Sequence, residues 1–325
     1  MVNIIMPAYN AHKTIRQAIA SVAAQDGQDK IKLTIVDDCS DEPYDYLADE
    51  YRYLNMEILR KPSNTGPGQA RQHGIDRTDC EYMMFLDADD CLYCPDAVKK
   101  LLATIEEGAY DVVSSVFLEE SACSGEYDIH RNDLIWMHGK IYRTQYIKER
   151  NIRFGKARLN EDNAFNTIIL NTDAEICFAE YATYVWKNNK DSITRNRGSE
   201  NYLADSIGDF IANAEHALKE SVRLRAAKKR LGVCMAQYMI TFYVYYLIFL
   251  QSQRSKAFLD GFIARVRGFC GSVPAGQREE VGEEQLGQMF YRHSMVNELI
   301  SQNIIMRISI YDFMEMIRPR KLLLR

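Results

Sequence analysis

The stretch YMMFLDADD, residues 82–90, decides the fold and marks a candidate site. Five uncharged residues, led by an aromatic one, run directly into three carboxylates, Asp87, Asp89 and Asp90. This is the pattern of a buried parallel strand that ends at the ligand-binding edge of an open α/β sheet. A solvated acidic turn would carry similar residues, so the rest of the chain must decide between the two interpretations.

The segments around this stretch repeat an alternation of strand and helix. Residues 2–6 are apolar and β-prone, and Pro7 is expected to end that strand. Ile15, Ile19 and Val22 then recur at helical spacing. Further strands are predicted at 31–38, 53–60, 82–86 and 111–117, and helices at 64–76 and 95–106. The alternation predicts an α/β fold with a mostly parallel, Rossmann-like sheet and helices on both faces.

Carboxylates close two of these strands. Asp37 and Asp38 end the strand at 31–38, as Asp87 and Asp89 follow the strand at 82–86. The two-residue spacing in D-A-D lets one carboxylate face a sugar hydroxyl while the other reaches a hard divalent cation through oxygen. Since both strands end in the same way, the sequence predicts one shared site for a metal-bound diphosphate.

A glycine-rich turn opens the predicted helix at 64–76, NTGPGQARQHGID. Gly66 and Gly68 permit close backbone approach at a helix start, where free N–H groups favour an anion. Arg71 adds a positive charge one turn later. The segment is therefore a second candidate contact for phosphate.

Composition excludes several classes of protein. The chain has 325 residues, which favours two domains, and 47% hydrophobic with 26% charged residues is typical of a globular protein. A net charge of −5 provides no basic field for nucleic acid. No secretory signal is visible, so we expect a cytoplasmic location with eight reduced cysteines. Cys91 and Cys94 lack the context of a zinc or redox pair, which favours two thiols on a loop.

Four motifs, in this order and spacing, resemble the family 2 inverting glycosyltransferases of the GT-A fold. They are IIMPAYNAHKTIRQAIASVAAQ, IVDDCSD, NTGPGQARQHGID and FLDADD. The resemblance continues more loosely through WMHGKIYR (136–143), RLNEDNAFN (158–166) and YVWKNNKDSITR (184–195). It implies a catalytic domain over residues 1–200, followed by a helical domain over 201–325.

The resemblance also implies roles for individual residues. Asp37 or Asp38 would hydrogen-bond the base or the ribose, and Arg71 would lie near the base and the diphosphate. Asp89 would be the direct ligand of Mn²⁺ or Mg²⁺, with Asp87 nearer the ribose or the sugar. The remaining donor contacts would be Pro7, Ala8 and Tyr9 around the nucleobase, and Ala88 within D-A-D.

An inverting transfer needs a carboxylate base, for which Glu161 and Asp162 are the candidates. They follow a basic segment and precede the apolar residues of a helix, where the helix dipole is expected to keep a carboxylate ionised. Ordinary helix capping by Asn160 and its acidic neighbours explains the same residues, but the resemblance favours a base, and we choose Asp162. No histidine occurs between Glu161 and His216, although some relatives place a metal ligand there.

Two further groups follow from the resemblance. Trp136, His138 and Lys140 would contact the acceptor or the donor sugar, although a core Trp and a solvated Lys explain them too. A basic loop carrying Ser192, Thr194 and Arg195 would close over the diphosphate. A solvated basic loop explains these residues nearly as well.

The last third changes to helical periodicity. Residues 203–229 predict an amphipathic helix, and helices are also expected at 255–268 and 284–317, with a linker at 271–284. The uncharged stretch 233–250 is interpreted first as a helix buried in a bundle or in a homo-oligomer interface, and second as shallow membrane contact. The basic tail IRPRKLLLR could add peripheral contact with anionic lipid at the inner face of a membrane.

These observations predict a metal-dependent inverting glycosyltransferase. The donor would be a nucleoside-diphosphate sugar, with UDP the commonest carrier in the family, and the acceptor a hydroxyl of a glycan or glycoconjugate. The alternatives are a non-catalytic binding scaffold, or a protein or modified nucleic acid as acceptor. A nucleotidyltransferase would need a basic Gly-rich loop directly after the first strand, where this chain has PAYNAH.

Overall fold

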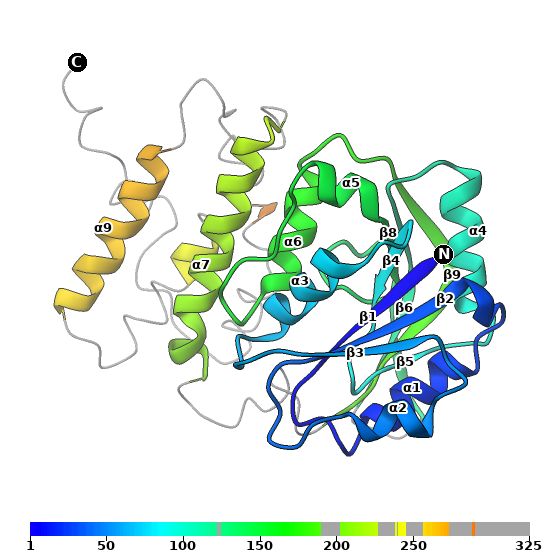
Figure 1. Cartoon of the computed structure of the whole chain (residues 1–325). Helices are drawn as coiled ribbons and strands as arrows, with labels where there is room; N and C mark the ends of the chain where they lie inside the picture. The colour runs from blue at the N-terminus through cyan, green and yellow to red at the C-terminus, as the bar shows by residue number, and fades with distance from the viewer. Residues whose placement is uncertain are drawn as a thin grey trace. The chain divides into compact units, whose positions relative to one another are not determined.

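The computed structural model describes residues 1–121, 125–189, 202–226, 238, 240–244, 256–272 and 288–289. The chain divides into two compact units, Met1–Arg197 and Gly198–Arg325. Figure 1 shows the strands together in the first unit and helices α7 and α9 in the second. The roles predicted for the two domains stay predictions.

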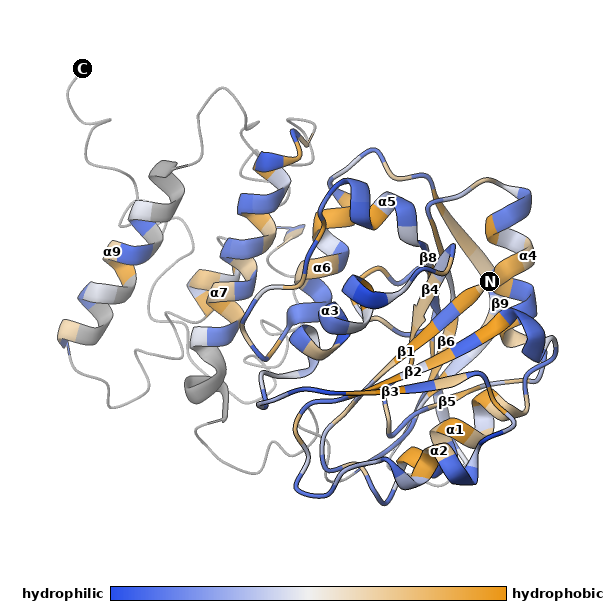
Figure 2. Cartoon of the chain, in the orientation of Figure 1, coloured by the Kyte–Doolittle hydropathy of each residue, from blue (hydrophilic) through white to orange (hydrophobic). Residues whose placement is uncertain are grey.

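Four parallel strands form one half of the sheet of the first unit. They are β1 (Val2–Ala8), β2 (Ile31–Asp37), β3 (Met56–Arg60) and β4 (Tyr82–Phe85), in the spatial order β3-β2-β1-β4. All residues of β1 are buried, as expected for a strand covered on both faces. Figure 2 shows the hydrophobic colouring along β1 and β2. The predicted alternation of strand and helix is confirmed in this half.

The other half of the sheet is mixed. It contains β8 (Lys140–Arg143), β6 (Val112–Glu120), β9 (Ile176–Trp186), β5 (Cys91–Leu92) and β7 (Tyr127–His130). The strand β8 runs antiparallel to both β4 and β6, whereas β6 and β9 are parallel. Of these strands only β6 was predicted, as the strand at 111–117. Antiparallel strands need no helical crossover between them, which is why the strand-then-helix pattern did not predict β8.

Two local predictions were wrong. Pro7 does not end β1, which continues to Ala8. The N–H that Pro7 lacks would point toward β4, but β4 stops at Phe85, opposite Ile5, so no ladder bond is lost there. Cys91 lies in β5 rather than on a loop. Both Cys91 and Cys94 are free thiols.

Helices cover both faces of the sheet, as predicted. One buried cluster joins Ile4 and Met6 of β1 to α1 (Ile15–Ala23), α2 (Tyr46–Glu50) and α4 (Ala97–Glu107). On the opposite face, α3 (Pro67–Arg77) packs so closely that a Cβ at Gly74 would lie 2.5 Å from Cγ2 of Ile5. The other helical segments of the described first unit are η1 (Gln28–Lys30), α5 (Thr144–Glu149) and α6 (Glu161–Leu170).

Gly74→Ala should therefore destabilise the first unit by about 1–3 kcal/mol, because the added methyl group overpacks the contact with Ile5. A denaturant titration measures the loss. In the double variant Ile5→Ala/Gly74→Ala the clash is gone, so its cost should be smaller than the sum of the two single costs. Strictly additive costs would contradict the close contact.

The second unit is described in part. The helix α7 (Tyr202–Arg223) confirms the predicted amphipathic helix, with Leu218 buried and Arg223 exposed, but it ends before residue 229. Arg225 has a φ of 56°, the left-handed conformation that terminates helices. The helix α9 (Lys256–Ser272) extends into the predicted linker.

Other predictions for this unit lie mostly outside the described residues. Within 233–250, only residues 238 and 240–244 are described, and five of these side chains are buried: Tyr238, Ile240, Phe242, Tyr243 and Val244. No helix in the described part of the chain is long and apolar enough to span a membrane. The predicted helix at 284–317 is described only at 288–289, and the basic tail is not described.

Candidate active site

The carboxyl ends of β1, β2 and β4 meet at one edge of the sheet, and Asp38 joins this edge to α3. Its carboxylate accepts the backbone N–H groups of Thr65 and Gly66, the latter at 2.7 Å, and pairs with the ammonium of Lys61 at 2.6 Å. Asp37 accepts the Ser40 N–H. Both carboxylates therefore hold the loops of the site, and their predicted contact with a base or ribose stays a prediction.

The residues predicted around a nucleobase lie at the end of β1. Pro7 and Ala8 are buried. Tyr9 follows them with 50% of its surface exposed. Of the three, Tyr9 is thus the residue that can offer an aromatic face to a ligand.

Arg71 connects the end of β4 with the start of α6. Its guanidinium donates from Nη2 to Oδ1 of Asp87 at 2.6 Å and from Nη1 to Oε1 of Glu161 at 2.6 Å, and its side chain is only 5% exposed. Burial alone would raise the pKa of Asp87, but Arg71 and His138 lower it. Asp87 is therefore a carboxylate at neutral pH. Arg71 thus bridges two acids in this structure, and its predicted place near the base and the diphosphate stays a prediction.

Asp162 occupies the first turn of α6 next to this bridge. Desolvation and the charge of Glu161 raise the pKa of Asp162 to about 7, although Arg71 opposes the rise. The helix dipole was expected to keep Asp162 ionised, and this expectation was wrong because burial and Glu161 outweigh it. Asn160 makes no side-chain capping bond to α6, whereas Oδ1 of Asp162 accepts the N–H of Asn163 in the first turn at 2.8 Å. A carboxylate with a pKa near 7 can accept a proton at neutral pH.

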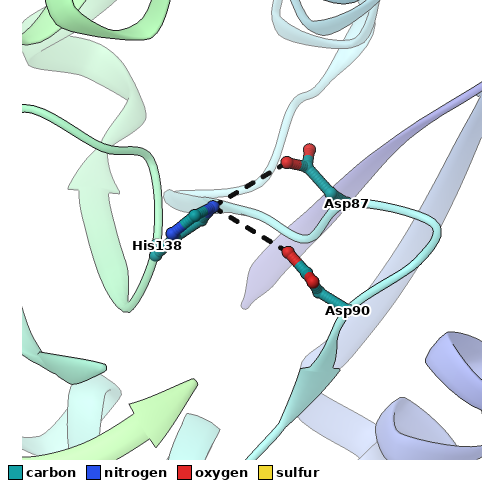
Figure 3. Close-up of side chains that lie close together, drawn as sticks. All are labelled: Asp87, Asp90 and His138. Atoms are coloured by element: carbon teal, nitrogen blue, oxygen red, sulfur yellow. Dashed lines mark ion pairs between the residues drawn. The ribbon is translucent and has the colours of Figure 1, made fainter. Parts of the chain in front are cut away.

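A cluster of possible metal ligands lies at the same edge. Atoms of Asp87, Asp90 and His138 lie within 4.8 Å of one another, and Figure 3 shows His138 facing both carboxylates. Nε2 of His138 is 3.9 Å from Oδ2 of Asp87 and 3.8 Å from Oδ2 of Asp90. Burial lowers the pKa of His138 to about 3, so its ring is neutral and keeps a lone pair for a cation. Carboxylate oxygens with one imidazole fit Mn²⁺.

This cluster differs from the predicted metal pair of Asp87 and Asp89. Asp89 is not part of it, and its Oδ2 accepts the amide of Asn189 at 2.9 Å. Both oxygens of Asp90 already accept hydrogen bonds, from the Tyr184 hydroxyl at 2.6 Å and the Lys187 N–H at 2.8 Å. Burial and the neighbouring acids raise the pKa of Asp90 well above its usual value. Sequence reasoning gave Asp90 no role, although it directly follows D-A-D.

Lys140 is buried, and its predicted contact with a sugar stays a prediction. Its ammonium donates to the carbonyl oxygen of Trp136 at 2.6 Å and to Oδ1 of Asp133 at 3.2 Å, and burial lowers its pKa to about 8. It therefore fixes the turn that carries Trp136 and His138. The partly exposed ring of Trp136 lies 5.1 Å from that of Trp186, which the sequence did not single out.

The family can be assigned from the sequence as a whole. The model of the family described as Glycosyl transferase family 2 matches residues 3–166, half of the chain. The chain belongs to this family. The matched residues contain the ends of β1, β2 and β4, Arg71, and the acidic start of α6. The predicted family is thereby confirmed.

Glycosyl transferase family 2 relatives cover different lengths of the chain. The poly(ribitol-phosphate) β-N-acetylglucosaminyltransferase TarS of Staphylococcus aureus is 28% identical over 170 residues, 47% of this chain and 29% of TarS. The uncharacterized glycosyltransferase EpsJ of Bacillus subtilis is 24% identical over 220 residues, 60% of this chain and 63% of EpsJ. The chain thus spans less than a third of TarS and less than two thirds of EpsJ.

Solved structures of similar proteins confirm the fold. S. aureus TarS 1–349 in complex with UDP-GlcNAc has a TM-score of 0.68 at 19% identity, covering 95% of this chain and 93% of that chain. The mannosyltransferase PcManGT of Pyrobaculum calidifontis, in complex with GDP-Man and Mn²⁺, has a TM-score of 0.53 at 14% identity, covering 93% and 86%. The predicted GT-A fold is confirmed.

The loop that the family resemblance placed over a diphosphate is described only at its start. Ser192, Thr194 and Arg195 lie outside the described residues. Lys187, which precedes them, pairs with Glu120 at 2.9 Å and donates its backbone N–H to Asp90. These two contacts therefore hold the residue that follows β9 at the acidic edge of the sheet.

Proposed function

We propose that the first unit transfers a sugar, with inversion, from a nucleoside-diphosphate donor to a hydroxyl of a glycan or glycoconjugate. The observation that carries this proposal is the position of Asp162. It lies at the start of α6 beside the Arg71 bridge to Asp87, with its pKa raised to about 7. A general base works best when its pKa lies near the working pH.

Asp162 would take the proton of the acceptor hydroxyl as that oxygen attacks the anomeric carbon. A bond forms between the acceptor oxygen and this carbon, and the bond from the carbon to the diphosphate oxygen breaks. The electron pair of the broken bond leaves with the nucleoside diphosphate. Because the acceptor attacks opposite the leaving group, the configuration inverts. Glu161 is already committed to Arg71 at 2.6 Å, so Asp162 is the better candidate for this proton.

Mn²⁺ or Mg²⁺ would neutralise the charge that builds on the leaving diphosphate. Asp87 and Asp89 are the proposed ligands. Asp90 and His138, which lie with Asp87 in the acidic cluster, are the alternative set. In this structure Asp87 is kept as a carboxylate by Arg71, and the neutral ring of His138 faces it.

UDP is the proposed carrier, and a hexose or N-acetylhexosamine is the proposed sugar. TarS, whose structure was solved with UDP-GlcNAc and shares this fold, supports that choice. Tyr9, exposed at the end of β1, is the residue proposed to cover the base.

A panel of nucleoside diphosphates, each with and without Mn²⁺, should identify the carrier through thermal unfolding. A ligand at a hundred times its dissociation constant stabilises the folded state by about 2.7 kcal/mol, a shift of a few degrees. We expect UDP to raise the melting temperature with Mn²⁺ and UMP, which lacks the second phosphate, to raise it much less. If neither nucleotide nor metal has any effect, the non-catalytic scaffold becomes the better interpretation.

A further inference from the structure

The helix α3 holds the chain segment that leads into α6. Gln69 donates to the carbonyl oxygen of Gly155 at 2.8 Å, and Gln72 accepts the N–H of Phe154 at 3.0 Å. Asp76 pairs with Arg153 through two hydrogen bonds, of 3.0 and 2.8 Å. Three successive turns of one helix therefore fix the path of residues 153–155, a few residues before Asp162.

The start of α6 also touches α3 directly. A Cβ at Gly68 would lie 2.7 Å from Cγ of Glu161 and 3.4 Å from the ring of Phe154. Such a distance leaves no room for a side chain, so the glycine permits this contact. The approach brings Glu161 within reach of the guanidinium of Arg71, one helical turn farther along α3.

Arg71 meets two acids with two different nitrogen atoms, one at Asp87 and one at Glu161, each at 2.6 Å. We propose that Arg71 is a positioning residue for the transfer reaction, which through Glu161 fixes the place and the charge surroundings of Asp162. Glu161 is then the counter-ion of Arg71 and not a second base. This inference rests on the proposed function, in which Asp162 is the base.

The charges facing Asp162 come from four elements. Glu161 on α6 and Asp87 after β4 raise its pKa, whereas Arg71 on α3 lowers it. Lys140 and Tyr142 on β8 also interact with it electrostatically. Because Glu161 and Arg71 act in opposite directions, removing their charges should shift the titration of Asp162 in opposite directions.

The pH dependence of kcat/KM tests whether Glu161 and Arg71 shift the titration of Asp162 in opposite directions. In Glu161→Gln the amide oxygen can still accept a hydrogen bond from Arg71, but the negative charge is lost. The acid limb of the profile, where kcat/KM falls as the base becomes protonated, should therefore move down by about 1 to 3 pH units. In Arg71→Gln it should move up by a similar amount. A merely structural role would lower kcat in both variants and leave the acid limb in place, which would overturn the inference.

Arg153→Gln is the matched control. It breaks another contact between α3 and the same segment, but its pair with Asp76 is exposed, so solvent screens the charge that the substitution removes. We expect its acid limb to stay unchanged. Arg71→Lys keeps the positive charge without the two-armed bridge, so its acid limb should stay near that of the parent while kcat falls.

A direct titration separates this inference from the proposed function. In protein labelled with ¹³C at the aspartate carboxyl carbons, the Asp162 signal is the one that Asp162→Asn removes. The midpoint of its titration should fall to lower pH in Glu161→Gln, whether or not the protein transfers a sugar. If Arg71→Gln does not fold, Glu161→Gln alone is sufficient for this test. An unchanged midpoint would overturn the inference. A lowered midpoint together with full activity of Asp162→Asn would instead overturn the assignment of the base.

Discussion

Asp162→Asn should lower the rate of sugar transfer by about 10²- to 10⁴-fold, the range that a general base contributes. The amide has the shape of the carboxylate and keeps the oxygen that accepts the Asn163 N–H at 2.8 Å, so the start of α6 should remain intact. It cannot take a proton from the acceptor hydroxyl. Initial rates with a UDP-sugar and an accepting glycan measure the loss, which should appear in kcat.

The matched control for this variant is Asp49→Asn. Asp49 also lies in the first turn of a helix, α2, but it is exposed and belongs to a different helix from Asp162. Its transfer rate should equal that of the parent. Nucleotide binding by Asp162→Asn should also be unchanged, because the base faces the acceptor. If Asp162→Asn transferred sugar at the parental rate while Glu161→Gln did not, the roles assigned to these two residues would have to be exchanged.

The parallel half of the sheet could be predicted because each of its strand-and-helix units is visible in one continuous segment of sequence. The strands β1, β2 and β4 are mostly apolar. A helix that covers the sheet follows β1 and β2 directly, and follows β4 after the short strand β5. Pro7 marks the limit of this reasoning. Its effect depends on whether a neighbouring strand extends as far as Pro7, and β4 ends at Phe85. The antiparallel strand β8 was missed for a related reason, since its four residues pair with segments that no local rule connects to them.

Sequence patterns found the acids of the candidate site but not their partners. Asp87 and Glu161 were singled out from their own motifs, yet 74 residues separate them, and only the fold shows that Arg71 joins them. The same holds for the pKa of Asp162. The position at a helix start was visible in the sequence, whereas desolvation and the charge of Glu161, which reverse the expected effect, depend on packing. The pairing of Asp90 with Tyr184 likewise crosses 94 residues.

Asp89→Asn should lower metal-dependent transfer by about 10³-fold, since a bound cation supplies several kcal/mol of charge stabilisation and each 1.4 kcal/mol is a factor of ten. The amide oxygen can still accept from Asn189, so the segment after β9 should keep its position. UDP should no longer stabilise the variant more strongly with Mn²⁺ than without it. Thermal unfolding and transfer rates over a range of Mn²⁺ concentrations measure the two effects.

Asp90→Asn distinguishes the two candidate ligand sets. Both oxygens of Asp90 are engaged, one by Lys187 and one by Tyr184. An amide can keep both contacts by accepting from the Lys187 N–H and donating to the Tyr184 oxygen. A greater loss of Mn²⁺ dependence in Asp89→Asn than in Asp90→Asn would therefore make Asp89 the ligand and Asp90 the group that anchors β9. The reverse order would move the cation to the cluster of Asp87, Asp90 and His138, because then the charge of Asp90, and not its hydrogen bonding, is what the site requires.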